Sequence, residues 1–188
     1  GAPGSGKTRL AQDFAASRGD YLVYGGRPGD TQVPFASSAR NARTVLERFP
    51  DVPLQEWVRR EMARVLPELA LPGEVLAPLS SEADVLRLRQ AMQVFFAERT
   101  GHLAAVVADD WQFYDYNSNQ DGIFMWNTPL PQGVQGKFPQ MIITYRRGEV
   151  APESEALILR LIDRFPLIIL FGGGLLGWIA GGMLLTDS

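Results

Sequence analysis

The first eight residues, GAPGSGKT, place glycines, a lysine and a hydroxyl side chain at the spacing of a phosphate-binding loop. The glycines allow the backbone to curl around a phosphate, and its successive N–H groups then point toward the anion. At this spacing the lysine reaches the β- and γ-phosphates, and the hydroxyl binds Mg²⁺. We therefore predict phosphate binding by Gly1, Gly4, Ser5, Gly6, Lys7 and Thr8, with Thr8 also a metal ligand.

The residues that follow this loop, KTRLAQDFAASR, are typical of a helix that ends at Gly19. We expect Leu10, Phe14 and Ala15 to lie on its packed side. A helix that begins at the loop turns its positive N-terminal end toward the same phosphates. Because a strand must hold such a loop in place, we expect that strand to precede Gly1 in a longer protein.

A second candidate group of side chains ends the apolar run LAAVVADD at positions 103–110. A short continuous apolar run predicts a strand that is buried on both faces. An acid at the end of such a strand, beside a phosphate-binding loop, holds Mg²⁺, and we assign this role to Asp109. Asp110 would then orient and polarise the water that attacks the γ-phosphate. The alternative is that the two acids only end a strand.

A third element is the segment QMIITYRR, in which residues 141–145 predict another buried strand. Arg146 follows this strand, at the edge of the sheet from which an arginine can reach a γ-phosphate. Arg147 is the neighbouring alternative, and a solvated surface arginine is the other interpretation. The single histidine, His102, is predicted to be an ordinary residue between a helix and a strand.

The elements that must position these side chains alternate between strands and helices. Helices are predicted over residues 33–49, 53–69, 80–101 and 152–165, and strands over 21–24, 103–110, 141–145 and 166–174. Ser81 and Asp84 form a predicted capping box, and Gly101 a helix stop. The polar, Pro- and Gly-rich segment 114–139 is left unassigned. The pattern predicts an α/β fold with a doubly wound, mostly parallel sheet flanked by helices.

The composition of the 188 residues limits the classes of protein to consider. Apolar residues make up 46% of the chain, which argues against disorder. The net charge is −3 and no Lys/Arg cluster exceeds a pair, so we expect no direct binding of nucleic acid by this segment. The absence of cysteine excludes disulfides and thiolate metal sites, which is compatible with the cytoplasm.

Five segments follow one another in a familiar order: GAPGSGKTRL, GRPGDTQVPFASSARNARTVLERF, WVRREMARVLPEL, VVADDWQFYD and ITYRRGEVAPESEALILRLID. In this order they resemble the AAA-like ATPase module of STAND-type P-loop NTPases. They are similar in particular to modules of large bacterial LuxR-type and SARP-type transcriptional regulators and of some bacterial cyclases. The resemblance covers most of residues 1–165, and it implies a P-loop NTPase fold with ATP or ADP and Mg²⁺ as cofactors.

The resemblance also implies a function in signal transduction and transcription regulation. Such modules are cytoplasmic switches that rest with ADP, exchange it for ATP on induction, and then open and often self-associate with help from other domains of the chain. It implies that Asp109 binds Mg²⁺, Asp110 is the catalytic acid and Arg146 senses the γ-phosphate. Asp110 stands where many relatives of the wider superfamily carry a longer Glu, which implies slow hydrolysis. The segment YNSNQDGIFMWN departs from the leucine-rich helix of the family.

The uncharged run at residues 165–185 allows two interpretations. Its length and its GxxxG spacing fit a membrane-spanning helix, whereas its glycine triplet favours a strand, a turn and a lid helix. We expect the second, with residues 1–171 as the NTPase core and 172–188 as the start of a lid helix or a hydrophobic tail.

Three other functions remain open at the level of sequence. The loop GAPGSGKT is also similar to that of adenylate-kinase-like enzymes, which predicts a kinase for a small nucleoside-phosphate-like substrate. A scaffold that binds nucleotide without hydrolysing it is a second alternative. A membrane-anchored module is a third, and it depends wholly on the run at 165–185.

Overall fold

The computed structural model describes residues 6–134, 136–146, 148–150, 152 and 155–156. The helices and strands given below lie in the first of two units, Gly1–Val150. The helices are α1 (Lys7–Arg18), α2 (Ala36–Arg48), α3 (Glu56–Ala63), α4 (Glu82–Thr100) and α5 (Tyr116–Asn127), and the strands are β1 (Tyr21–Gly25), β2 (Ala105–Asp109) and β3 (Gln140–Ile143).

The strands form a three-stranded parallel sheet in the order β1-β2-β3. In the central strand, Val107 pairs with Val23 of β1 on one side and with Ile142 of β3 on the other. The register also places Gly25 opposite Asp109, so the carboxyl ends of the strands meet at one edge. The α/β class and the parallel sheet expected from the sequence are therefore confirmed.

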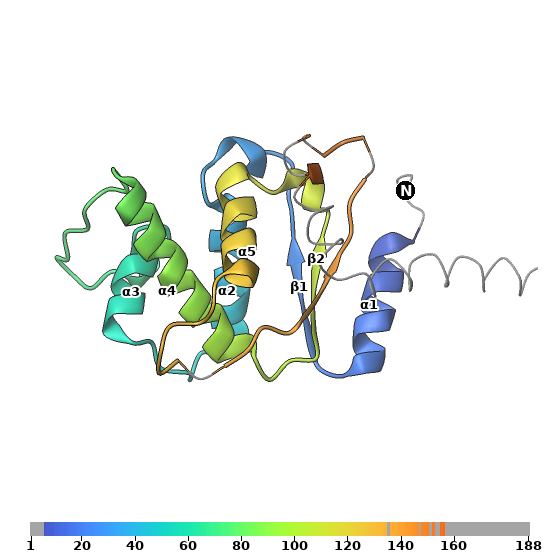
Figure 1. The fold of residues 1–188 in the computed structure, drawn as a ribbon, viewed down its shortest axis with the longest axis horizontal. Coiled ribbons are helices and arrows are strands. Elements are labelled where there is room, and N and C mark those ends of the chain that lie inside the picture. The colour runs from blue at the N-terminus through green and yellow to red at the C-terminus, as the bar shows by residue number, and fades with distance from the viewer. Residues whose placement is uncertain (1–5, 135, 147, 151, 153–154, 157–188) are drawn as a thin grey trace, which may run out of the picture. The chain divides into compact units, whose positions relative to one another are not determined.

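Helices cover both faces of this sheet, as Figure 1 shows with α1 on one side and α2 and α5 on the other. We call the first side the α1 face. On it, Ala11 and Ala15 of the helix pack against Ala105 and Val107 of β2, and these small contacts keep the helix close to the sheet. Leu10, which was expected on the packed side of α1, is instead 48% exposed.

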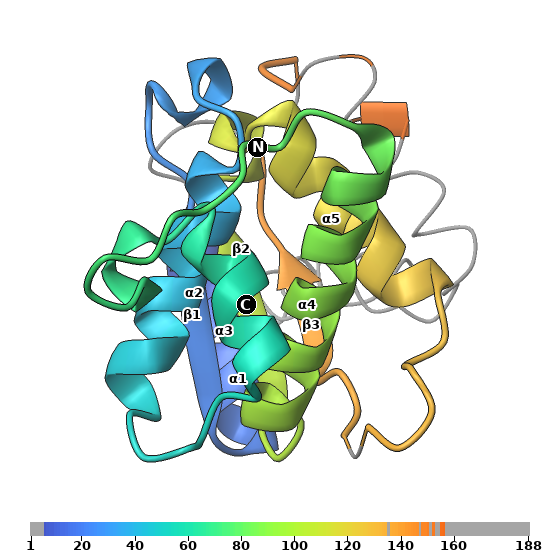
Figure 2. The same ribbon diagram turned by 90° about the vertical axis from the view of Figure 1, so that its left-hand side faces the viewer.

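The opposite side, which we call the α2–α5 face, carries the larger core. Leu22 and Val106 point into it from the sheet, and α4 contributes the fully buried Phe95. Figure 2 shows α3 and α4 nearest the viewer, with the sheet behind them. Every residue of α4 from 91 to 97 is buried, so its apolar surface is wider than the predicted stripe. The capping box of Ser81 and the stop at Gly101 are confirmed.

One helix prediction needs correction, and one unassigned segment contains a helix. The helix expected over 53–69 is confined to α3, and a short 3₁₀ turn at Pro67–Leu69 follows it. Its predicted apolar Trp57 is 42% exposed. The segment left unassigned contains a helix, α5, whose N-terminus is capped by Asp115 accepting from the Ser118 N–H. The capping bond compensates for a sequence of weak helix formers.

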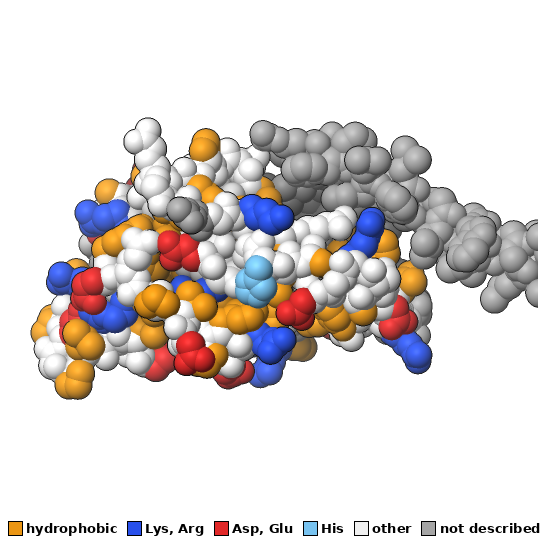
Figure 3. All heavy atoms as spheres, turned by 90° about the horizontal axis from the view of Figure 1, so that it is seen from below, with side chains coloured by type: hydrophobic (Ala, Val, Ile, Leu, Met, Phe, Trp, Pro, Cys, Tyr) orange, Lys and Arg blue, Asp and Glu red, His pale blue; other side chains and the backbone are white. Residues whose placement is uncertain are grey.

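Other predictions lie outside the described residues: the loop residues 1–5, Arg147, most of the helix at 152–165, the strand at 166–174, the boundary at 171/172 and the run at 165–185. Within the described part of the chain, no helix is long and apolar enough to cross a membrane. On the face seen in Figure 3, acidic and basic side chains are interspersed among apolar ones.

Candidate functional site

The first turn of α1 lies at the carboxyl edge of the sheet. Gly6 precedes the helix with φ 75°, in the left-handed region that strains any residue with a side chain. Glycine at the N-cap brings no side chain of its own to cap the helix. Lys7 and Thr8 follow as the first two residues of the helix. This is the geometry of a helix N-terminus that can receive an anion.

Thr8 and Asp109 meet across the sheet edge although they are 101 positions apart in the sequence. The Thr8 hydroxyl Oγ1 lies 3.0 Å from both carboxylate oxygens of Asp109 and donates to the carboxylate. Asp109 is the last residue of β2, which is why its side chain reaches the edge. The structure therefore brings together the two residues that the sequence predicted as metal ligands.

These two oxygen donors fit the coordination chemistry of Mg²⁺. In proteins Mg²⁺ is usually held by one or two carboxylates, with water and substrate phosphates completing the shell. Among the described residues there is no group of three or more His, Cys, Asp or Glu side chains that could hold a metal. The pair of Thr8 and Asp109 therefore suits a metal that arrives with a phosphate ligand better than an all-protein metal site.

Thr144, which the sequence analysis did not select, completes this arrangement. It follows β3 directly and is only 8% exposed. Its hydroxyl donates a short hydrogen bond to Asp109 Oδ1 and accepts one from the Asp110 N–H at 3.2 Å. Its carbonyl also accepts from the Trp111 N–H at 3.0 Å. One buried threonine thus fixes both the carboxylate and the backbone that follows it.

Asp110 leaves the strand in a left-handed conformation, with φ 52° and ψ 47°. Aspartate tolerates this conformation better than most residues, and the turn separates its side chain from that of Asp109. The Gln112 amide donates to Asp110 Oδ1 at 2.8 Å, and its carbonyl accepts from the Arg146 N–H at 3.1 Å. Gln112 therefore links the predicted catalytic acid to the predicted sensor residue.

The Arg146 guanidinium already faces carboxylates. Its Nε lies 4.0 Å from Asp110 Oδ1, and its Nη1 lies 3.3 Å from Glu149. Its side chain is 31% exposed, and its guanidinium carbon lies 5.9 Å from the centre of the Phe113 ring. Arg146 is thus at the sheet edge, as predicted, and both of its partners are acids that an incoming anion could replace.

Gly26 shows how closely the backbones approach at this edge. Its N–H donates to the Asp109 carbonyl at 2.9 Å. A Cβ added at Gly26 would lie 2.4 Å from the Asp110 carbonyl oxygen, well inside contact distance. The end of β1 therefore requires glycine for the two acids to sit as they do.

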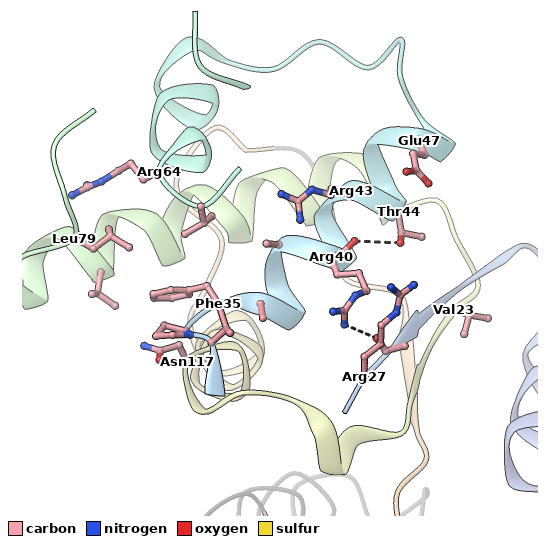
Figure 4. A pocket seen from close by; sticks show the side chains of 17 residues that line it. Val23, Arg27, Phe35, Arg40, Arg43, Thr44, Glu47, Arg64, Leu79 and Asn117 are labelled. Carbon is pink, nitrogen blue, oxygen red and sulfur yellow. Dashed lines mark hydrogen bonds between the residues drawn. The ribbon is translucent and has the colours of Figure 1, made fainter. Parts of the chain in front are cut away.

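A groove of about 1200 Å³ adjoins this edge at Gly25 and runs along α2. Figure 4 shows several arginines along it. Arg40 binds both carboxylate oxygens of Asp30, and this hydrogen bonding lowers the pKa of Asp30. Arg43 binds Glu68 at 2.6 Å. These ion pairs neutralise the two arginines. An anion is therefore attracted less strongly to them than to the sheet edge beside α1.

Comparison of the chain with protein-family models, with curated proteins and with solved structures finds no match. The interpretation of the site therefore depends on its own geometry. That geometry places Gly6, Lys7, Thr8, Asp109, Asp110 and Arg146 at one edge of the sheet. Sequence reasoning missed Thr144 and Gln112; Thr144 lies inside the predicted strand over 141–145, whereas β3 ends at Ile143 in the structure.

Proposed function

We propose that this chain is the ATP-binding module of a regulatory switch that hydrolyses ATP slowly. The observation that carries the proposal is the contact between the Thr8 hydroxyl and the Asp109 carboxylate at 3.0 Å. A phosphate-loop threonine and a strand-terminal aspartate that lie this close can share one ligand, and Mg²⁺ bound to a nucleotide is a ligand that suits both.

Each residue at the edge has a part in this proposal. The α1 N-terminus and Lys7 bind the phosphates, while Thr8 and Asp109 hold Mg²⁺. When bound, Mg²⁺ neutralises charge on the phosphate oxygens. Asp110 accepts a hydrogen bond from the attacking water and orients it. We name ATP rather than GTP because of the family resemblance. No side chain of the described residues is assigned to recognition of the base.

Arg146 would report whether the γ-phosphate is present. In the structure its guanidinium pairs with Glu149 at 3.3 Å. A phosphate is a stronger bidentate partner for arginine than a half-exposed carboxylate. The exchange of Glu149 for phosphate would move the segment after β3, and Gln112 would carry this movement to Asp110. Such a coupling serves a switch better than it serves a kinase.

Calorimetric titration of the chain with Mg-ATP and Mg-ADP tests the proposal. Wild type should bind both, and Lys7→Ala should bind at least tenfold more weakly because the β- and γ-phosphates lose their cation. Lys137→Ala is the matched control, since it removes the other lysine, which is exposed. No binding by wild type would overturn the proposal in favour of a structural role.

Turnover separates a switch from a scaffold that only binds nucleotide. Wild type should release phosphate slowly, and Asp110→Asn should reduce the rate by about 10²- to 10⁴-fold while leaving the nucleotide affinity within a few-fold. Asp13→Asn on the exposed side of α1 should leave both unchanged. If wild type binds Mg-ATP but releases no phosphate, the chain is a scaffold that binds nucleotide without hydrolysing it.

A further inference from the structure

The strand β1 is an outer strand of the sheet, and among the described residues it pairs with β2 alone. An outer strand presents a row of unpaired N–H and C=O groups, which proteins commonly protect with charged residues or proline. The sequence of β1, YLVYG, holds neither. Its open side can therefore pair with the backbone of another chain.

The hydrogen bonding to β2 shows which backbone groups face this open side. The Gly26 N–H donates to the Asp109 carbonyl of β2 at 2.9 Å. Residues two apart along a strand face the same way, so the bonds to β2 are made by even-numbered residues. Val23 and Gly25 therefore turn their N–H groups away from β2, toward the open side.

The groove of about 1200 Å³ described above runs beside this open side. Val23 and Gly25 line it from β1, and a row of residues lines it from α2. The volume exceeds the ~300–1,000 Å³ of a site for a drug-sized ligand. Several kinds of domain bind an extended peptide by adding it to an exposed strand edge, and a groove beside such an edge has room for one.

The helix α2 runs back along β1 in the opposite direction. Arg40, in the first half of α2, donates to the Gly25 carbonyl at the end of β1 at 3.2 Å. Arg48, the last residue of α2, lies 3.6 Å from Asp20, which precedes β1. One end of the groove is therefore beside the end of β1, and the other is beside its start.

These two ends carry opposite charges. Arg27 lines the end beside Gly25, and Glu47 lines the end beside the start of β1. Figure 4 shows Arg27 next to Arg40, and Glu47 farther along α2. Both are exposed, and within the described part of the chain neither side chain has an ion pair or a hydrogen bond. They differ in this from Arg40 and Arg43, which already hold acids.

We propose that the open side of β1 binds an extended peptide segment of a partner protein, with an acidic residue at one end and a basic residue at the other. Its backbone pairs with Val23 and Gly25, its carboxylate binds Arg27, and its basic group binds Glu47. The five residues of β1 span ~17 Å, so a peptide of about six residues covers the edge.

A peptide fits this edge better than a second copy of the chain does. Figure 2 shows α2 in front of β1, and the two pack together in the large core through Ala39 and Leu22. A second copy that paired through its own β1 would bring its own α2 against this one. A peptide carries no helix, so it can lie beside the strand.

This proposal does not depend on nucleotide binding. Arg27, Glu47 and Val23 have no part in the proposed nucleotide site, although the groove adjoins that site at Gly25. The test therefore uses the chain without nucleotide. Binding of the peptide would stand even if the calorimetric titration with Mg-ATP failed.

Titration of the nitrogen-15-labelled chain with the blocked peptide acetyl-Lys-Thr-Val-Thr-Val-Glu-amide tests the proposal, since its β-branched residues favour an extended backbone. The amide resonances of Val23 and Gly25 should shift and saturate, with a Kd of about 1 mM or below. Ala11 and Ala15, on the α1 face, are internal controls whose resonances should not move. The absence of a saturable shift at Val23 would overturn the proposal.

Two N-methylated forms of the same peptide test the backbone pairing. Only alternate N–H groups of an added strand point toward β1. Methylation of one alternate set should weaken binding at least tenfold, and methylation of the other set should leave it within about threefold. Equal affinities of the two forms would show that the peptide does not add as a strand.

Variants of the chain test the two contacts separately. Val23→Pro removes an N–H that β2 does not use, so the variant should fold and should bind the peptide at least tenfold more weakly. Arg27→Gln should weaken binding about fivefold, and only for the peptide that carries glutamate rather than glutamine. Arg9→Gln is the matched control, because Arg9 is an exposed arginine on α1. Unchanged affinity of Arg27→Gln for the acidic peptide would contradict the assignment of the carboxylate site.

Sedimentation of the chain alone decides between a peptide and a second copy. The chain should be monomeric at the concentrations of the titration. A dimer that Val23→Pro dissociates would overturn the proposal, because the open side of β1 would then pair between copies of this chain.

Discussion

The two faces of the sheet are built from the same strands but differ in the size of their buried core and in their distance from the candidate site. On the α1 face a single helix contacts the strands through Ala11 and Ala15, and this helix begins at the candidate nucleotide site. On the α2–α5 face three helices bury large apolar side chains such as Met92 and Phe95. Stability is thus concentrated on one face, and the predicted chemistry lies beside the other.

The period of two along a strand produces this division. In β1, Leu22 and Tyr24 belong to the large core, whereas Tyr21 and Val23 pack on the α1 face. Small residues opposite α1 bring its N-terminus close to the end of β2, where Asp109 lies. Mutations on the two faces should therefore affect different properties: unfolding on one face, ligand binding on the other.

The largest effect is expected from Phe95→Ala, on the α2–α5 face. Phe95 is fully buried and packs edge-on against Phe96, at 5.1 Å between ring centres. Its truncation should lower the free energy of unfolding by about 3–5 kcal/mol, measured by urea denaturation. Leu10→Ala on α1 is the comparison and should change it by less than about 0.5 kcal/mol. Similar losses for the two variants would contradict the division between the faces.

The next effect is expected at Asp115, which joins α2 to α5. Its carboxylate accepts from the N–H groups of Phe35 and Ser37 and from the N–H and hydroxyl of Ser118. Asp115→Ala leaves these buried donors without partners and should cost about 2–4 kcal/mol of unfolding free energy in urea.

Asp115→Asn is the matched variant, because its amide keeps one acceptor oxygen of similar shape. It should cost less than Asp115→Ala. If alanine were tolerated without loss, the cap would not be what holds α5, and the helix would owe its stability to its other contacts with α2 and α4.

The parts of the fold that could be predicted from the sequence are those that depend on local features. β2 was found because its apolar run and its final acid are local features of the sequence. The capping box of α4 is local as well. α5 was missed because its residues are weak helix formers, and long-range bonds hold it: Ser38 on α2 and Arg89 on α4 both bind Asp121.

The same reasoning applies to the candidate site. The loop and the two acids were identified from types and spacing, but their contact could not be, because Thr8 and Asp109 meet only through the tertiary fold. Thr144 and Gln112 were missed because their roles depend on the register of β3 beside β2. The prediction for α3 was too long because apolar spacing continues through Val65 after the helix has ended.

A pH effect is expected from Asp121, which lies in the wall between α2 and α5. Burial raises its pKa to about 6, against the opposing effects of Ser38 and Arg89, and the nearby Asp115 adds to the rise. The folded state therefore holds a proton that the unfolded state has lost between about pH 4 and 6. The stability from this group is full below pH ~4 and is lost as the pH rises through ~6.

The measurement is the free energy of unfolding of wild type and Asp121→Asn at several pH values. The difference between them should change by about 3 kcal/mol from pH 4 to 7, with wild type losing stability relative to the variant. Asp20→Asn is the control, since Asp20 is more than half exposed. A constant difference would mean that Arg89 keeps Asp121 ionised throughout.

The smallest effect on stability is expected at Thr8, on the α1 face. Thr8→Ala removes the hydroxyl that lies 3.0 Å from Asp109, yet the pair is exposed, so unfolding should change by no more than about 1 kcal/mol. The same change should weaken Mg-ATP binding at least tenfold, because the proposed Mg²⁺ ligand is lost. Thr8→Ser keeps the hydroxyl and should restore most of the affinity.

The ratio of these two effects distinguishes the faces most directly. At Phe95 the loss is expected in unfolding, and at Thr8 in nucleotide affinity. Denaturation and calorimetry on the same Thr8→Ala sample measure both. Suppose instead that the stability of Thr8→Ala fell by several kcal/mol while its affinity for Mg-ATP was unchanged. The contact with Asp109 would then serve to hold α1 against the sheet, and it would not be evidence for a nucleotide site.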